Sequence, residues 1–166
     1  MTERIHRVMR AMILLYAGDP KRIQHFTKVH AYAALIGREE QLDNTTQEIL
    51  EIAALTHDIG IHACEQQYGQ CGGKLQEREG PAIARPLLEE TGIPAEIAER
   101  VCFLIAHHHT YTGVDAADWQ ILLEADFLVN AYEDGLTDST IQQGCERVFK
   151  TPSGTALCRH MFGLHT

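Results

Sequence analysis

Residues 45–63 read TTQEILEIAALTHDIGIHA, and this stretch carries the strongest signals for both fold and chemistry. Its apolar positions follow a helical period: Ile49, Ile52, Ala53 and Ile59. His57 follows Ala53 by four residues, which places its side chain on the same helix face. Asp58 is the next residue, and neighbouring helix positions diverge by only about 100°. An imidazole and a carboxylate beside one apolar face can therefore reach the same ion.

The helical period extends along almost the whole chain, and no stretch alternates for long as a half-buried strand does. Helices are predicted at 3–17, 20–41, 45–63, 81–91, 94–107, 118–133, 139–149 and 153–162. The glycine-rich stretch 65–80 is predicted to be a long loop, with Gly80-Pro81 marking a helix boundary. The sequence thus predicts an all-α helical bundle, a single domain over residues 1–166, with motifs at 22–134 and C-terminal helices at 139–162.

Composition narrows the class of partner. The chain has 14 Lys and Arg against 23 Asp and Glu, a formal net charge of −9, which argues against extended nucleic acid as a partner. The apolar run at 11–17 is too short to span a membrane and lacks a cleavage site, so no membrane partner is expected. Five cysteines, with none in a CxxC pair, indicate reduced, buried thiols and a cytoplasmic protein.

Two further polar residues fall on apolar helix faces. His25 lies on the stripe of Val29 and Ile36, whereas its rival His30 is turned about 100° from Val29. We therefore prefer His25 as a ligand. Asp126 follows Leu122 by four residues and precedes Val129 by three. A carboxylate there needs a partner, because burying an isolated charge costs several kcal/mol.

A lone buried histidine is more often a hydrogen-bonded core residue than a ligand, so the prediction rests on the conjunction. His25, His57, Asp58 and Asp126 together offer two imidazoles and two carboxylates. Such a set leaves water positions open in an octahedral site. It suits Fe, Mn, Co or Ni, with Mg or Zn as further choices.

At these residues the chain resembles the HD-domain superfamily of metal-dependent phosphohydrolases, whose pattern is His, His-Asp and a later Asp. The matching segments are HFTKV at 25–29, AALTHDIG at 53–60 and EADFL at 124–128. The resemblance implies an all-helical hydrolase in which His25, His57, Asp58 and Asp126 hold the metal. It further implies a small phosphorylated substrate, mostly a nucleotide, with a homo-oligomer left open.

The chain also departs from that pattern. His62 stands two residues after the motif glycine, where many members have Lys or Arg, and is a candidate for proton transfer. Gln76 stands where dinuclear members have a histidine, which makes a second metal uncertain. The candidates for a second metal or a substrate phosphate are His107, His108 and Glu79, with Glu77 close by.

The expected mechanism uses a metal-bound water, oriented by Asp58, to attack phosphorus. Lys74, Arg78 and Arg85 are the expected phosphate contacts, although solvated surface charge explains them equally well. Two other function classes remain open. One is a dinuclear-iron oxygenase of the same fold, and the other is a non-catalytic nucleotide sensor in which metal stabilises the bundle.

Overall fold

The computed structural model describes residues 2–164, and within that range the secondary structure is entirely helical. The nine helices of this range are α1 (Glu3–Leu15), α2 (Pro20–Glu39), α3 (Asn44–Thr56), α4 (Ile61–Tyr68), α5 (Gly73–Glu90), α6 (Ala95–Ile105), α7 (Ala117–Glu133), α8 (Asp138–Val148) and α9 (Pro152–Phe162). The predicted all-α class is confirmed. None of these helices is both long and apolar enough to cross a bilayer.

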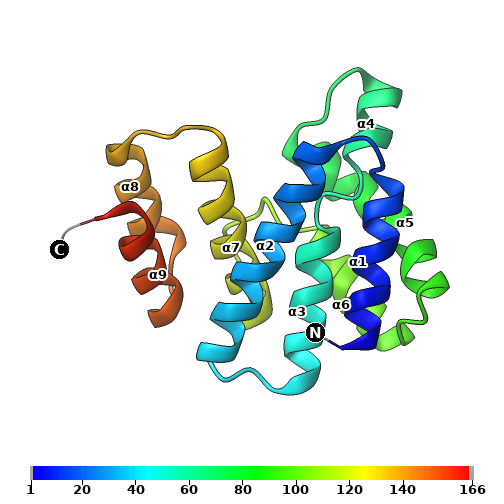
Figure 1. Ribbon diagram of the computed structural model, residues 1–166, viewed down its shortest axis with the longest axis horizontal. Helices are drawn as coiled ribbons and strands as arrows, with labels where there is room; N and C mark the ends of the chain where they lie inside the picture. Colours follow the sequence, from blue (N-terminus) through cyan, green and yellow to red (C-terminus); the bar gives the residue numbers. More distant parts are fainter. Residues whose placement is uncertain (1, 165–166) are drawn as a thin grey trace.

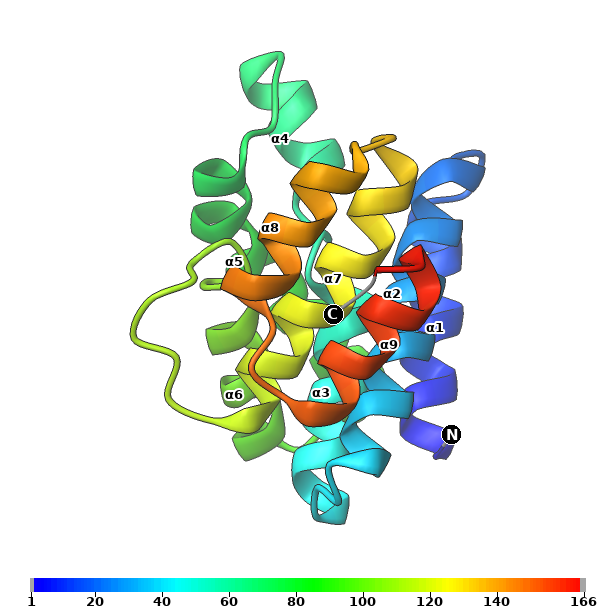
Figure 2. The same cartoon turned by 90° about the vertical axis from the view of Figure 1, so that its left-hand side faces the viewer.

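Helices α2, α3 and α7 lie side by side at the centre of the molecule (Figure 1) and contact one another. On one side, α1 packs on α3, and α6 packs on α3 and α5. On the other side, α8 and α9 cover α7 (Figure 2). The apolar faces of the central helices are fully buried, as at Val29, Leu55 and Leu122. Polar side chains on these faces are therefore held in a water-poor interior.

The predicted single helix over 45–63 is wrong at its C-terminal third. Helix α3 ends at Thr56, residues 57–60 form a turn, and α4 begins at Ile61. Two backbone hydrogen bonds between residues three apart close the turn. Ile59 N donates to the Thr56 carbonyl (3.0 Å), and Ile61 N donates to the Asp58 carbonyl (3.1 Å). Because of this turn, His57 and Asp58 stand at the end of a helix rather than along its side.

The predicted loop over 65–80 is also wrong, since only residues 69–72 lie outside helices. Pro81, expected at a helix start, lies inside α5. A proline there cannot donate to the carbonyl four residues earlier. Neighbouring atoms pack closely against the two glycines near Pro81. A Cβ atom added to Gly80 would lie only 2.6 Å from Ile105 Cγ2, and one added to Gly60 would lie 3.3 Å from Gly80 Cα. Tertiary packing thus overrides the local stop signal.

Buried carboxylates fix the C-terminal helices to the central layer. Glu124 of α7 is fully buried and accepts hydrogen bonds from the backbone N–H groups of Lys150 (2.7 Å) and Thr151 (3.0 Å). Glu40, just after α2, accepts from Ser153 N (2.8 Å) in the first turn of α9. Carboxylates satisfy the free N–H groups of a helix start and match its positive dipole end. These contacts therefore fix the start of α9 to α7 and to the C-terminal end of α2.

Candidate metal centre

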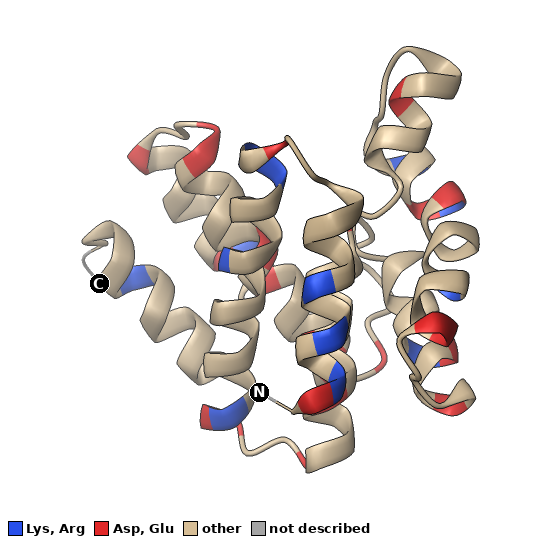
Figure 3. Cartoon of the chain, turned by 45° about the vertical axis from the view of Figure 1, so that its right-hand side comes forward, with Lys and Arg blue, Asp and Glu red and all other residues tan. Residues whose placement is uncertain are grey.

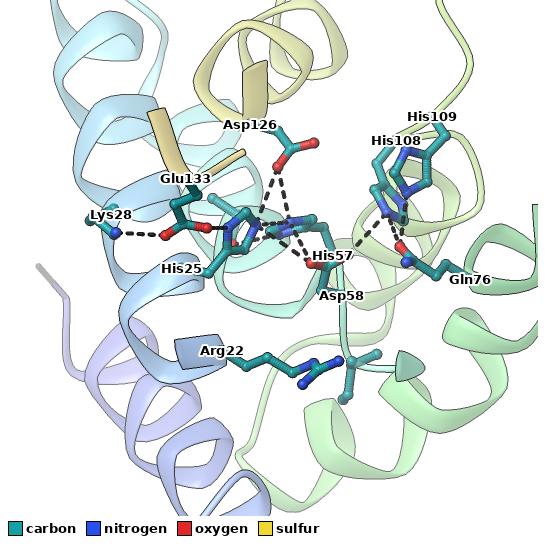
Figure 4. Close-up of polar contacts among 12 residues, drawn as sticks. Arg22, His25, Lys28, His57, Asp58, Gln76, His108, His109, Asp126 and Glu133 are labelled. Carbon is teal, nitrogen blue, oxygen red and sulfur yellow. Dashed lines mark hydrogen bonds and ion pairs between the residues drawn. The ribbon is translucent and has the colours of Figure 1, made fainter. Parts of the chain in front are cut away.

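Four polar side chains from three parts of the chain meet in the interior (Figure 4). His25 comes from α2, His57 and Asp58 from the turn after α3, and Asp126 from α7. His25 Nε2 lies 3.3 Å from His57 Nε2, 3.3 Å from Asp126 Oδ1 and 3.5 Å from Asp58 Oδ2. His57 Nε2 lies 3.5 Å from the same oxygen of each aspartate. The structure thus brings together all four residues named by the sequence.

The outer nitrogens of both imidazoles face acceptors. His57 Nδ1 lies 2.9 Å from the Ala54 carbonyl, and His25 Nδ1 lies 2.8 Å from Glu133 Oε2. A carbonyl or carboxylate oxygen can only accept, so each Nδ1 donates its proton. In the neutral rings, each Nε2 then carries a lone pair within 3.5 Å of an oxygen of each aspartate. His25, His57 and Asp58 are close enough to hold one ion together, and Asp126 lies beside both imidazoles. A divalent cation is the natural partner for such a set of lone pairs.

Asp126 supports the same interpretation. Its Oδ1 atom is buried and makes no hydrogen bond within residues 2–164, although His25 Nε2 and His57 Nε2 lie 3.3 and 3.5 Å away. Buried acceptors are nearly always satisfied, and an orphaned carboxylate oxygen beside two imidazoles indicates a missing positive charge. The residues present therefore fit a metal ion.

The pKa shifts of His57 and Asp126 show that the cluster favours a positive charge. Burial lowers the pKa of His57, but the carboxylates of Asp58 and Asp126 outweigh burial and raise that pKa to about 9. Burial raises the pKa of Asp126, yet its contacts with His25 and His57 hold the value below the ordinary range. A bound cation would satisfy the same demand without protonating the imidazoles.

A second group of ligand atoms shares Asp58. Its other oxygen, Oδ1, lies 3.4 Å from His108 Nε2, and His108 Nδ1 faces the Ile105 carbonyl at 2.7 Å. Gln76 Oε1 lies 3.1 Å from His108 Nε2 and 2.8 Å from His109 Nε2. Asp58, His108 and His109 are close enough to hold an ion together. Asp58 therefore stands between two potential cation positions.

The second group differs in membership from the sequence prediction. The sequence favours a ligand or substrate contact from at least one of the three adjacent histidines at 107–109, and His108 and His109 face the site. His107 turns away: its Nδ1 faces the Phe103 carbonyl at 2.7 Å and its ring stacks on Phe103. Glu79 pairs with Arg78 (2.6 Å) rather than with the histidines. Adjacent histidines at a helix end look alike in sequence, and only the turn that ends α6 decides which of them face inward.

The residue pair Glu133 and Lys28 supports His25 from outside the cluster. Glu133 accepts from His25 Nδ1 and pairs with Lys28 Nζ at 2.6 Å (Figure 4). Such a carboxylate orients the imidazole and raises its basicity toward a metal. The sequence analysis missed Glu133. Its position seven residues after Asp126, and therefore on the same helix face, was the available signal.

A cavity of about 430 Å³ opens onto the cluster, and its lining includes His25, Asp58 and Asp126. Its basic lining residues are Lys21 and Arg22, from the first turn of α2. They precede His25 by four and three residues, a spacing that puts all three side chains on one side of the helix. The same spacing could have identified them from the sequence.

The predicted phosphate contacts lie elsewhere. Lys74 pairs with Glu77 (3.5 Å) and is largely exposed, Arg78 pairs with Glu79, and Arg85 pairs with Glu99. None of these three cations lines the cavity. Acidic and basic residues are mixed along several helices (Figure 3), so position in the sequence alone does not reveal which cations face the site.

Three other sequence predictions concern His62, His30 and the cysteines. His62 Nε2 lies 3.0 Å from Asp19 Oδ2, its ring packs on Tyr16, and it does not line the cavity. His30 is 3.0 Å from Glu51 Oε2 in a separate buried pair, which agrees with the preference for His25. All five cysteines are free thiols, four of them buried, while Cys71 is half-buried and lines the cavity.

An all-helical fold with a His, His-Asp and Asp centre defines the class of protein. A model of the HD domain family matches residues 22–131, and the chain belongs to this family. The fold is similar to the crystal structure of a predicted HD superfamily hydrolase from an uncultured Thermotogales bacterium. The TM-score is 0.67 and the identity 23%, covering 95% of this chain and 84% of that one. No curated protein matches the sequence.

Proposed function

We propose that the chain is a metal-dependent phosphohydrolase acting on a small phosphoester or phosphoanhydride, nucleotides included. The observation that carries the proposal is that His25, His57 and Asp58 lie close enough to hold one ion, while the buried Oδ1 of Asp126, which makes no hydrogen bond, lies 3.3 Å from His25 Nε2 and 3.5 Å from His57 Nε2. Membership of the HD domain family supports it. The cavity gives a substrate access to the centre and places two basic side chains at its edge.

His25, His57, Asp58 and Asp126 would hold the ion. The bound metal supplies a more acidic water and positive charge for the phosphoryl oxygens. Asp58 is partly accessible, with 21% of its side chain exposed, and can accept a proton or hydrogen bond from the attacking water. Lys21 and Arg22 can offset charge on the phosphate. His62 is bonded to Asp19, so we assign no step to it.

For the number of ions, we propose one tightly held metal and a weaker second position at Asp58, His108 and His109. Gln76 offers that second position a neutral oxygen where a histidine would offer a stronger ligand. Burial and the neighbouring His108 lower the pKa of His109 to about 4, so its ring is neutral near pH 7. A neutral His109 is available as a ligand or as a hydrogen-bond donor to substrate.

The test is phosphate release from p-nitrophenyl phosphate, AMP and ATP by protein stripped with chelator and reloaded separately with Mn²⁺, Fe²⁺, Co²⁺, Ni²⁺, Mg²⁺ or Zn²⁺. We expect metal-dependent turnover of at least one compound, abolished by Asp126→Asn and retained by Asp138→Asn. Asp138 is an exposed residue at the start of α8. Metal binding without turnover would favour the sensor interpretation, and a mixed-valent iron pair that consumes oxygen would favour the oxygenase.

A further inference from the structure

The cavity has little surface on which a nucleobase could stack. Its volume of about 430 Å³ lies toward the lower end of ligand pockets, which span about 300–1,000 Å³. Among its lining residues in the described part of the chain there is no Phe, Tyr or Trp, and Ile61 is the one aliphatic side chain. Recognition of a base commonly uses aromatic or guanidinium planes. The planar groups in the lining are already engaged: His25 faces the carboxylates, His109 packs on His108 with ring centroids 4.0 Å apart, and the Arg22 guanidinium is held by two carboxylates. The lining instead suits a polar group.

The charges at the cavity match one phosphate rather than a chain of phosphates. Arg22 is held between Asp19 (2.9 Å) and Glu65 (2.6 Å), which neutralise much of its charge. Lys21 is exposed and makes no salt bridge within residues 2–164. Glu65 and Asp134 add negative charge to the lining. Additional phosphates would meet these carboxylates at close range, which is unfavourable.

Two side chains near the end of α7 offer hydrogen-bond acceptors to the cavity. Asn130 and Asp134 are four residues apart at the end of α7, and both line the cavity. Neither side chain makes a hydrogen bond to another described residue of the chain, whereas Glu133 between them is used by His25 and Lys28. Free carboxylate and amide oxygens bind hydroxyl groups well.

Resting on the proposed function, we propose that the substrate is the phosphomonoester of a small polyhydroxylated alcohol or sugar. Its phosphate lies between the metal centre and Lys21, and its hydroxyls donate to Asp134 and Asn130. The site selects such compounds over nucleotides because the rings and the guanidinium that line the cavity are already engaged, and because extra phosphates meet Glu65 and Asp134.

Ribose 5-phosphate and AMP form the sharpest pair of probes, since AMP carries adenine where ribose 5-phosphate has its anomeric hydroxyl and the two are otherwise alike. We expect kcat/KM for ribose 5-phosphate to exceed that for AMP by about tenfold, with ATP lower still. A binding measurement without turnover uses phosphonate analogues of both compounds, titrated calorimetrically into metal-loaded protein. The ribose analogue should bind more tightly. Tighter binding of the AMP analogue, or preferred turnover of AMP or ATP, would overturn the proposal.

Variants locate the hydroxyl contact. Asp134→Ala should weaken binding of the ribose analogue about tenfold, as expected for loss of a charged hydrogen bond, while the exposed control Asp138→Ala should not. The ratio of kcat/KM for ribose 5-phosphate to that for p-nitrophenyl phosphate, which has no such hydroxyls, should fall about tenfold in Asp134→Ala and stay unchanged in Asp138→Ala. Equal loss on both substrates would contradict the assignment of Asp134. Absence of phosphate release from every probe, with the ribose analogue still bound, would refute the hydrolase proposal and leave this binding preference standing.

Discussion

At the scale of single residues, the proposed metal centre rests on the lone pairs of two imidazole nitrogens and two aspartate oxygens that lie close together. His25 and His57 each donate from Nδ1 to an acceptor behind the ring, so their Nε2 atoms, 3.3 Å apart, both face the aspartate oxygens. Such an arrangement is unfavourable in the neutral state and favourable around a cation. Each ligand can therefore be tested singly.

The two histidines of α2 make a matched comparison. His25→Ala should reduce metal content and abolish turnover, because His25 Nε2 faces the carboxylates. His30→Ala should leave metal content within a few-fold, since His30 pairs with Glu51 instead. Metal analysis after gel filtration distinguishes the two, with circular dichroism to show that both variants fold. Loss of metal in His30→Ala alone would mean that the wrong face of α2 had been assigned.

Glu133 tests the supporting contact to His25. Glu133→Ala removes the acceptor at His25 Nδ1 while leaving all four ligands in place. Loss of such a partner typically weakens metal affinity by about 10–100-fold. Competition with a chromophoric chelator measures the affinity, and Glu89→Ala, at an exposed position of α5, serves as control. Unchanged affinity in Glu133→Ala would show that the contact does not orient the imidazole.

At the scale of elements, α1 supports the turn that carries His57 and Asp58. Tyr16, just after α1, is buried and its hydroxyl lies 2.9 Å from the Asp58 carbonyl and 3.1 Å from the Ile59 carbonyl. Burial raises the pKa of Tyr16 above its ordinary value, so the hydroxyl stays protonated and can donate. A helix outside the matched family segment thus positions a ligand.

Tyr16→Phe removes this donor, which leaves the Ile59 carbonyl without its hydroxyl partner and the Asp58 carbonyl with only the bond from Ile61 N. We expect the free energy of unfolding to fall by about 1–3 kcal/mol, measured by urea denaturation, with weaker metal binding as a second effect. Tyr132→Phe, at a side chain that is 76% exposed, should change neither quantity. An unaltered midpoint in Tyr16→Phe would show that the turn is held by its own backbone bonds.

Glu124 tests the connection between α7 and the C-terminal helices. Glu124→Ala leaves the N–H groups of Lys150 and Thr151 without their buried acceptor, and we expect a loss of at least about 2 kcal/mol. Glu146→Ala, at an exposed site of α8, is the matched control. Equal stability of the two variants would contradict the proposed anchoring.

At the scale of the whole molecule, long helices with a clear apolar face could be predicted from the sequence. The meeting of His25, His57, Asp58 and Asp126 could be predicted too, because a charged residue on such a face needs a partner. The break after Thr56 and the continuation of α5 through Pro81 could not. Gly60 and Gly80, far apart in sequence, approach each other closely beside both features. Lys21 and Arg22 could not be singled out as the cations of the cavity either, since only the packed helices show which cations face it.

The number of metal ions is also a property of the assembled molecule, because the second position draws on α5 and on the turn after α6. Replacing Gln76 by histidine should raise the stoichiometry toward two ions per chain. Two ions of equal affinity in the unmodified protein would show instead that Gln76 does not limit the second position.

Metal stoichiometry is the most direct test of the central claim that His25, His57, Asp58 and Asp126 form a metal centre. The measurement is elemental analysis of gel-filtered protein, before and after reconstitution with Mn²⁺, Fe²⁺, Co²⁺ and Ni²⁺, in the unmodified chain and in Asp58→Ala. We predict about one tightly bound ion per chain in the unmodified protein, none in Asp58→Ala, and a higher melting temperature only where metal is bound. Unmodified protein that retains no ion after any reconstitution, or an Asp58→Ala variant that retains a full equivalent, would contradict the account.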